Sequence, residues 1–139
     1  MDRTLAATIV GFILAAFGVL SAHAQDLKAM LLKPTNGWVI DWVSPSVRGS
    51  GMRDSGASEV VFEERGGKVV AKLYITNEGA YKADLPNCER DVAITADTIS
   101  LDGCRDQNVV LILDPNDKIY PLKTKTKTVN GYDWKLKEK

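Results

Sequence analysis

Histidine is almost missing from this sequence: among 139 residues there is one, His23. It lies in an N-terminal segment, residues 1–24, that we expect to be removed before the protein folds. The remaining chain, residues 25–139, would then have neither the commonest general base nor the commonest metal ligand of proteins. We therefore expect no catalytic residue, no metal site and no cofactor.

An excess of charge and a long apolar run are missing as well. The chain has 18 basic and 18 acidic residues, so it lacks the basic field that draws proteins to nucleic acids. Its N-terminal apolar stretch, residues 5–20, is shorter than the roughly 20 residues that a membrane-spanning helix needs. We expect no nucleic-acid partner, no stable insertion into a membrane, and a single domain over residues 25–139.

The N-terminal segment has the features of a secretory signal peptide. Arg3 precedes the apolar run, and Ala22-His23-Ala24 forms a cleavage site of small residues before Gln25. We expect cleavage after Ala24 and export of the mature protein, either to the periplasm of a Gram-negative-type cell or out of the cell.

Cysteine is scarce too, because only Cys88 and Cys104 occur. In an oxidising compartment their expected state is a disulfide. The rival interpretations are a redox pair, which usually has C-x-x-C spacing, and half of a zinc site, which would need two further ligands. A structural disulfide is the interpretation that we favour.

Short runs of β-branched and aromatic residues dominate the mature segment. A helical turn is expected at its start, with Asp26 as the N-cap and Pro34 and Gly37 ending it. Residues 38–43 predict a buried first strand, and residues 44–58 predict a long loop rich in glycine and serine.

Hairpin signals follow along the rest of the chain. Gly66-Gly67 separates the strand-like residues 59–65 and 68–75, and residues 91–101 suggest two short strands whose ends Cys88 and Cys104 clamp. The apolar residues 109–113 predict a strand buried on both sides, followed by a turn at residues 114–117 and a return strand that starts at residues 118–121.

The last hairpin is predicted by Asn130-Gly131, which lies between residues 122–128 and residues 132–136. Alternation places Tyr132, Trp134 and Leu136 toward the core. Seven to nine short antiparallel strands predict an all-β fold, a small up-and-down β-barrel or a sandwich, and we favour the barrel because closure removes exposed edges.

Candidate ligand-binding residues are basic or aromatic. Lys123, Lys125 and Lys127 would share one strand face and could meet an anion, although exposed strand lysines also serve to prevent edge-to-edge pairing. Trp38 and Trp134 are expected in the core, whereas Trp42 borders the long loop and could contact a ligand. Arg48 and Arg53 lie in that loop.

Glu59 and Glu63 share a strand face, but the sequence does not define the distance between them that a catalytic pair of carboxylates would need.

Asn36-Gly37-Trp38 and the tryptophan-bearing strand after it resemble the opening of calycin-type barrels, the superfamily that includes lipocalins. In calycin-type barrels a short N-terminal helical turn precedes a first strand whose tryptophan fills the base of the barrel. Mature size and a single disulfide also look like those of small periplasmic barrel inhibitors of metalloproteases. The resemblance implies structural roles for Gly37 and Trp38. Here the glycine directly precedes the tryptophan, whereas lipocalins usually have one residue between them.

Two functions follow as expectations. The first is an exported, non-enzymatic protein that binds a small ligand or a component of the bacterial envelope. The second is an inhibitor of an exported protease or lysozyme, which would insert residues 44–58 or 25–34 into its target enzyme. A ligand binder predicts an apolar cavity open to solvent, and an inhibitor predicts a filled barrel with a protruding segment.

Overall fold

The structure is a computed structural model, and it describes residues 22–46, 51–77, 87–104, 108–126 and 131–139. One helix, α2, is described, and eight strands follow it. Their bounds are α2 Ala22–Leu32, β1 Trp38–Val43, β2 Ser55–Arg65, β3 Lys68–Asn77, β4 Cys88–Ile94, β5 Ile99–Asp102, β6 Asn108–Leu113, β7 Leu122–Thr124 and β8 Asp133–Glu138.

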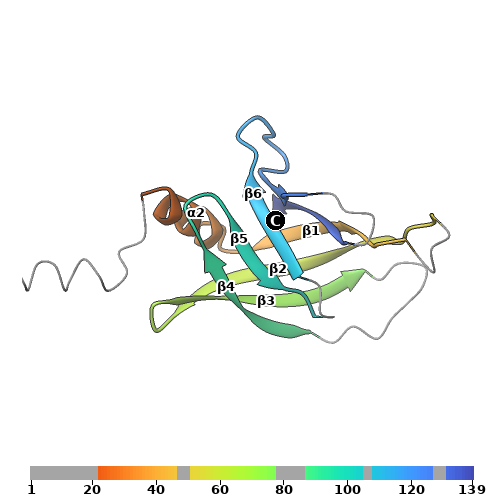
Figure 1. Cartoon of the computed structure of the whole chain (residues 1–139). Helices are drawn as coiled ribbons and strands as arrows, with labels where there is room; N and C mark the ends of the chain where they lie inside the picture. The colour runs from red at the N-terminus through yellow and green to blue at the C-terminus, as the bar shows by residue number, and fades with distance from the viewer. Residues whose placement is uncertain (1–21, 47–50, 78–86, 105–107, 127–130) are drawn as a thin grey trace, which may run out of the picture.

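The strands form a closed antiparallel barrel in the order in which they occur in the chain. Strand β1 closes it by pairing with β2 on one side and with β8 on the other, so that Trp42 lies opposite Gly56 and Trp134. Helix α2 lies at one end of the barrel (Figure 1). The all-β prediction and its barrel form are therefore confirmed.

Alternation along the strands fills the interior with apolar side chains. Inward-facing residues from all eight strands contribute to one core, and most of them are almost completely buried. They are Trp38, Ile40, Val60, Phe62, Val69, Ala71, Leu73, Val92, Ile94, Ile99, Leu101, Val109, Leu111, Leu122, Trp134 and Leu136. The predicted core positions Trp38, Trp134 and Leu136 are confirmed, and Tyr132 is partly buried against the same core.

Trp38 anchors the helix to the barrel. Its indole Nε1 donates a hydrogen bond to the carbonyl oxygen of Leu31, at 3.1 Å, and Leu27 and Leu31 join the core. Gly37 precedes it with φ at 81°, a conformation that favours glycine. An added Cβ there would lie 2.5 Å from the carbonyl oxygen of Val60, so the close approach of the two segments also requires glycine.

Two expectations near the N-terminal end were wrong in their boundaries. Among the described residues helix α2 begins at Ala22, so Asp26 lies inside the helix and is not its N-cap. The helix extends further back because alanine, the best helix former, occupies two of the four positions before Asp26. The bond after Ala24 lies between two residues of this helix, and cleavage there stays a prediction. The predicted loop over residues 44–58 is shorter, because the Ser44 amide and Oγ bond to the backbone of Asp54 and β2 starts at Ser55.

The hairpin at Gly66-Gly67 is confirmed. Both glycines have positive φ, 56° and 80°, as a two-residue turn between twisted strands requires.

Strand β6, in contrast, is not buried on both sides. Val109 and Leu111 face the core, whereas Val110 and Ile112 are only half-buried, because a barrel wall has one inner and one outer face.

The return strand was also predicted too long. Residues 118–121 form no strand, and β7 ends at Thr124, so the connection to β8 is longer than a two-residue turn. The turn at residues 114–117 is confirmed, and Asn130 lies outside the described residues.

The Cys88–Cys104 disulfide is present, with the two Cα atoms 5.6 Å apart. It lies beside the seam between β4 and β5, one of the two shortest strand ladders in the barrel. Only Ala93 with Ser100 and Ile94 with Ile99 pair across that seam.

Candidate functional site

The larger of two described pockets is a cleft of ≈ 740 Å³, which we call the outer cleft. By strand alternation it runs mainly along the outer face of β1, β2, β7 and β8, rather than inside the barrel. Residues 114–121, the β6–β7 loop, contribute one wall. The lining residues are Asp41, Trp42, Val43, Ser55, Gly56, Ala57, Asp117, Tyr120, Lys123, Thr124, Asp133, Trp134 and Lys135.

The strand register explains why charged residues gather there. Asp41 on β1 is the register partner of Lys135 on β8, and Lys135 is in turn the partner of Lys123 on β7. All three neighbour inward-facing core residues in sequence, so alternation turns them outward. Three strands thus place an acid and two bases in one row on the barrel wall.

The β6–β7 loop is held by its own hydrogen bonds. The amide of Asp114 bonds to the carbonyl oxygen of Pro121 at 2.7 Å, and the Asp117 Oδ1 accepts from the amides of Ile119 and Tyr120 at 3.1 and 2.8 Å. The loop projects from the barrel wall after β6 (Figure 1). These bonds fix its path and with it one wall of the outer cleft.

Lys123 ties this loop to β7. Its Nζ lies 3.1 Å from the Asp114 Oδ2 and 2.7 Å from the Asp117 Oδ2. The hydrogen bond from Lys123, together with those from backbone amides, lowers the pKa of Asp117 to about 2. The two carboxylates in turn raise the pKa of Lys123. Lys123 is therefore committed within the protein rather than offered to a ligand.

Tyr120 folds back from the loop over the outer face of the barrel. Its hydroxyl donates a hydrogen bond to the Asp41 Oδ2, which raises the pKa of the tyrosine and keeps it protonated. The Nζ of Lys135 lies 5.0 Å from the centre of its ring, and that of Lys137 lies 5.7 Å away. Both distances suit cation–π attraction.

The predicted ligand-binding residues divide into three groups. Trp42 and Lys123 line the outer cleft, and Arg53 borders it by pairing with Asp133 at 3.2 Å. Lys125 is exposed beyond the end of β7, so the predicted face of three strand lysines is wrong. Arg48 and Lys127 lie outside the described residues.

Trp42 is less buried than the other two tryptophans. Its ring meets that of Tyr132 edge-on, with centroids 6.1 Å apart. Because it also lines the cleft, it offers a fluorescent reporter for occupancy.

Sequence reasoning missed Asp41, Tyr120 and Lys135. Alternation within residues 38–43 and 132–136 would have turned Asp41 and Lys135 outward, because their neighbours in sequence are apolar. The return of Tyr120 over β8 and β1 had no local signal in the sequence.

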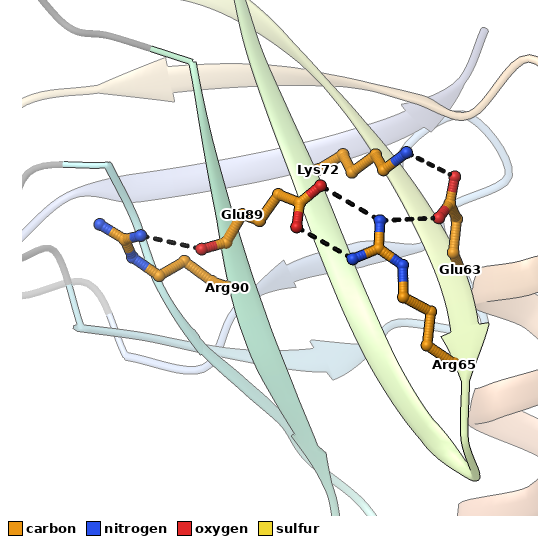
Figure 2. A network of polar contacts seen from close by, with 5 residues as sticks. All are labelled: Glu63, Arg65, Lys72, Glu89 and Arg90. Carbon is orange, nitrogen blue, oxygen red and sulfur yellow. Dashed lines mark hydrogen bonds and ion pairs between the residues drawn. The ribbon is translucent and has the colours of Figure 1, made fainter.

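A second group of charges lies on the outer faces of β2, β3 and β4 (Figure 2). Arg65 forms two hydrogen bonds with Glu89 and one with Glu63, which also pairs with Lys72 at 3.0 Å. These contacts lower the pKa of both carboxyl groups. Arg90 points to the other side of β4 in Figure 2 and donates to the Glu89 carbonyl oxygen. Two acids and two bases balance here, so we assign this group to structure.

Glu59 and Glu63 do share the outer face of β2, but each already has a cationic partner. Glu59 pairs with Lys139 at 2.6 Å and Glu63 with Lys72 and Arg65. The second described pocket, ≈ 360 Å³, lies near Lys28, Lys68 and Asp91, away from both.

Within the described residues, no group of three or more histidine, cysteine, aspartate or glutamate side chains is arranged to hold a metal ion. None of the described helices is long and apolar enough to cross a membrane. Comparison with protein-family models gave no match, and comparisons with curated proteins and with solved structures gave none either. The resemblance to calycin-type barrels therefore stays a prediction.

Proposed function

We propose that this protein is an exported, non-enzymatic binding protein of the bacterial envelope, and that the outer cleft holds its ligand. The observation that carries the proposal is the cleft itself, ≈ 740 Å³ with a wall fixed by hydrogen bonds. Small-molecule sites typically measure about 300–1,000 Å³ and are largely preformed. The ligand would be a small molecule or a component of the envelope.

The contents of the cleft support binding over catalysis. Asp117 accepts hydrogen bonds from Lys123 and from two backbone amides, and Asp133 pairs with Arg53. A carboxylate held in the way that Asp117 is held makes a poor general base, since its pKa is lowered and both of its oxygens accept hydrogen bonds. The interior of the barrel is packed with apolar side chains, so the apolar cavity expected of a ligand binder is not found there among the described residues. The filled barrel is what the inhibitor hypothesis predicts, and the binding proposal depends on the polar outer cleft instead.

The test is to fill the cleft with one side chain. Ser55→Trp places an indole in the cleft, and Ser100→Trp makes the same change on the outer face of β5, which does not line it. The full chain is expressed in a Gram-negative host, and equilibrium dialysis is run against peptidoglycan fragments, phospholipid headgroups and amino acids. We expect binding that Ser55→Trp weakens at least about tenfold and Ser100→Trp leaves unchanged. Equal effects of the two variants, or no binding, would contradict the proposal.

An inhibitor of an exported hydrolase is the second candidate, and Ile119 favours it. This residue lies in the β6–β7 loop and is 67% exposed. Among the described residues, no other large hydrophobic residue is more exposed. A rigid loop with an apolar side chain suits insertion into an enzyme cleft, because little conformational entropy is lost on binding. The inserting segment would then be residues 114–121 instead of 44–58 or 25–34.

Enzyme assays with purified lysozymes and exported proteases test this candidate. Ile119→Asp should relieve any inhibition by the wild-type chain, whereas Met52→Asp, at another exposed hydrophobic residue, should not. Full activity of every enzyme in the presence of the wild-type chain would remove the inhibitor candidate.

A further inference from the structure

Asp41 and Lys135 are opposite charges in register that do not pair with each other. They face each other across the β1–β8 ladder, where such side chains lie about 5 Å apart at Cβ and commonly attract. No ion pair joins them within the described part of the chain, in which eight other ion pairs are found. Both line the outer cleft.

Tyr120 accounts for their separation. Its hydroxyl holds the Asp41 carboxylate, while its ring attracts the Lys135 ammonium at 5.0 Å. A neutral phenol satisfies one carboxylate oxygen without cancelling the negative charge, and a ring face attracts an ammonium without cancelling the positive charge. One negative and one positive group therefore remain side by side on the wall of the cleft.

The other charged residues that line the cleft already have ion-pair partners within the protein. Lys123 binds both Asp114 and Asp117, so that group keeps one net negative charge. Asp133 pairs with Arg53 through its Oδ2, while its buried Oδ1 has no hydrogen-bond partner among the residues that the structure describes. Lys135 is exposed and Asp41 is half-buried, so both remain accessible from the cleft. Asp41 and Lys135 are thus the charged residues lining the cleft that form no ion pair within the described residues, and Lys137 lies near them as a second cation.

We propose that the outer cleft binds a zwitterion, a small molecule that carries an ammonium group and an anionic group a few bonds apart. Asp41 would accept hydrogen bonds from the ammonium, and Lys135 would meet the carboxylate or phosphate. Charge-assisted hydrogen bonds of this kind are about twice as strong as neutral ones. Amino acids with short peptides, and aminoalkyl phosphate headgroups, share this chemistry. The inference rests on the cleft being the binding site.

The test uses two zwitterions, the dipeptide Ala-Ala and glycerophosphoethanolamine, each with its N-acetylated counterpart, and also the dipeptide amide. Binding to the full chain is measured by calorimetry and by Trp42 fluorescence. Loss of either ligand charge should weaken binding at least about tenfold, which corresponds to about 1.4 kcal/mol. The stronger of the two zwitterions identifies the source of the ligand.

Two substitutions assign each ligand charge to its partner. Asp41→Asn keeps an oxygen for the Tyr120 hydroxyl, so the fold is retained, but free and N-acetylated ligands should then bind equally. Lys135→Gln should make acid and amide bind equally. Asp91→Asn and Lys68→Gln, at the second pocket, serve as matched controls and should leave all affinities unchanged.

Three results would overturn the inference. Equal binding of the zwitterion and its N-acetylated form by the wild-type chain would indicate a simple anion site, and equal binding of acid and amide would indicate a cation site. Failure of both zwitterions to bind in the millimolar range would reject zwitterion recognition altogether. Another ligand class whose binding is sensitive to Ser55→Trp would still leave the proposed function standing.

Discussion

Replacing Cys88 and Cys104 by serine measures how much the disulfide stabilises the seam between β4 and β5. The bond closes a loop with a sequence separation of 16. In the chain-entropy account, a loop of that length restricts the unfolded state by about 3 kcal/mol at 25 °C. Only two residue pairs connect β4 to β5, so few backbone hydrogen bonds remain to hold the seam after the bond is lost.

Urea unfolding followed by tryptophan fluorescence measures the effect, because Trp38 and Trp134 are buried and report on loss of the core. With an m value of about 2 kcal/mol/M, a loss of about 3 kcal/mol lowers the urea midpoint by about 1.5 M. A reducing agent should lower the wild-type midpoint by the same amount and leave the double variant unchanged.

A loss below about 1 kcal/mol would refute this reasoning, because it would mean that the unfolded chain is not restricted by the bond as the model requires. A further fall in the double variant on reduction would refute it too, since no disulfide remains there to be reduced. Hydrogen exchange distinguishes a local loosening of the seam from a loss of global stability. The amides of residues 88–92 in β4 should exchange faster in the variant. The exchange rates of amides in the β2–β3 hairpin should rise only as far as the lower global stability requires.

Three further predictions concern single residues. The folded pKa of Asp117, about 2, lies below its unfolded value. Its contribution to stability is therefore present above about pH 4 and is lost as the pH falls toward 2. In Lys123→Gln, an acid titration followed by NMR should show a higher pKa for Asp117. Gly37→Ala should lower the free energy of unfolding by about 1–3 kcal/mol, and Gly51→Ala, with a similar φ but open space around it, by less; an equal loss in both would contradict the close-contact argument. Trp38→Phe should cost about 1–3 kcal/mol in thermal or urea unfolding, because the Leu31 carbonyl loses its buried donor, and an unchanged midpoint would mean that water replaces that donor.

Much of the barrel could be predicted because its signals are local. Gly66-Gly67 has the conformational freedom that a tight hairpin needs, and residues 38–43 combine β-branched and aromatic side chains. The disulfide followed from an even number of cysteines and expected export. Each of these inferences depends on residues that are close in sequence or on simple counting.

The boundaries and most of the site could not be predicted, because long-range contacts determine them. The Ser44 Oγ accepts a hydrogen bond from the Asp54 amide, and this contact closes the loop before β2. Lys123 forms ion pairs with the two aspartates of the loop that precedes it. The position of Tyr120 depends on Asp41, 79 residues away in sequence. No periodic pattern encodes such a contact.

The pairing of β1 with β8 has a consequence for when this chain can fold. The ladder joins Trp38 to Glu138, and the Lys139 amide bonds to the carbonyl oxygen of Gly37 at 3.1 Å. Until β8 is in place, β1 has one unpaired edge and the barrel cannot close. Folding that depends on such distant contacts is slow. The barrel thus closes only after its first and last strands, β1 and β8, have met.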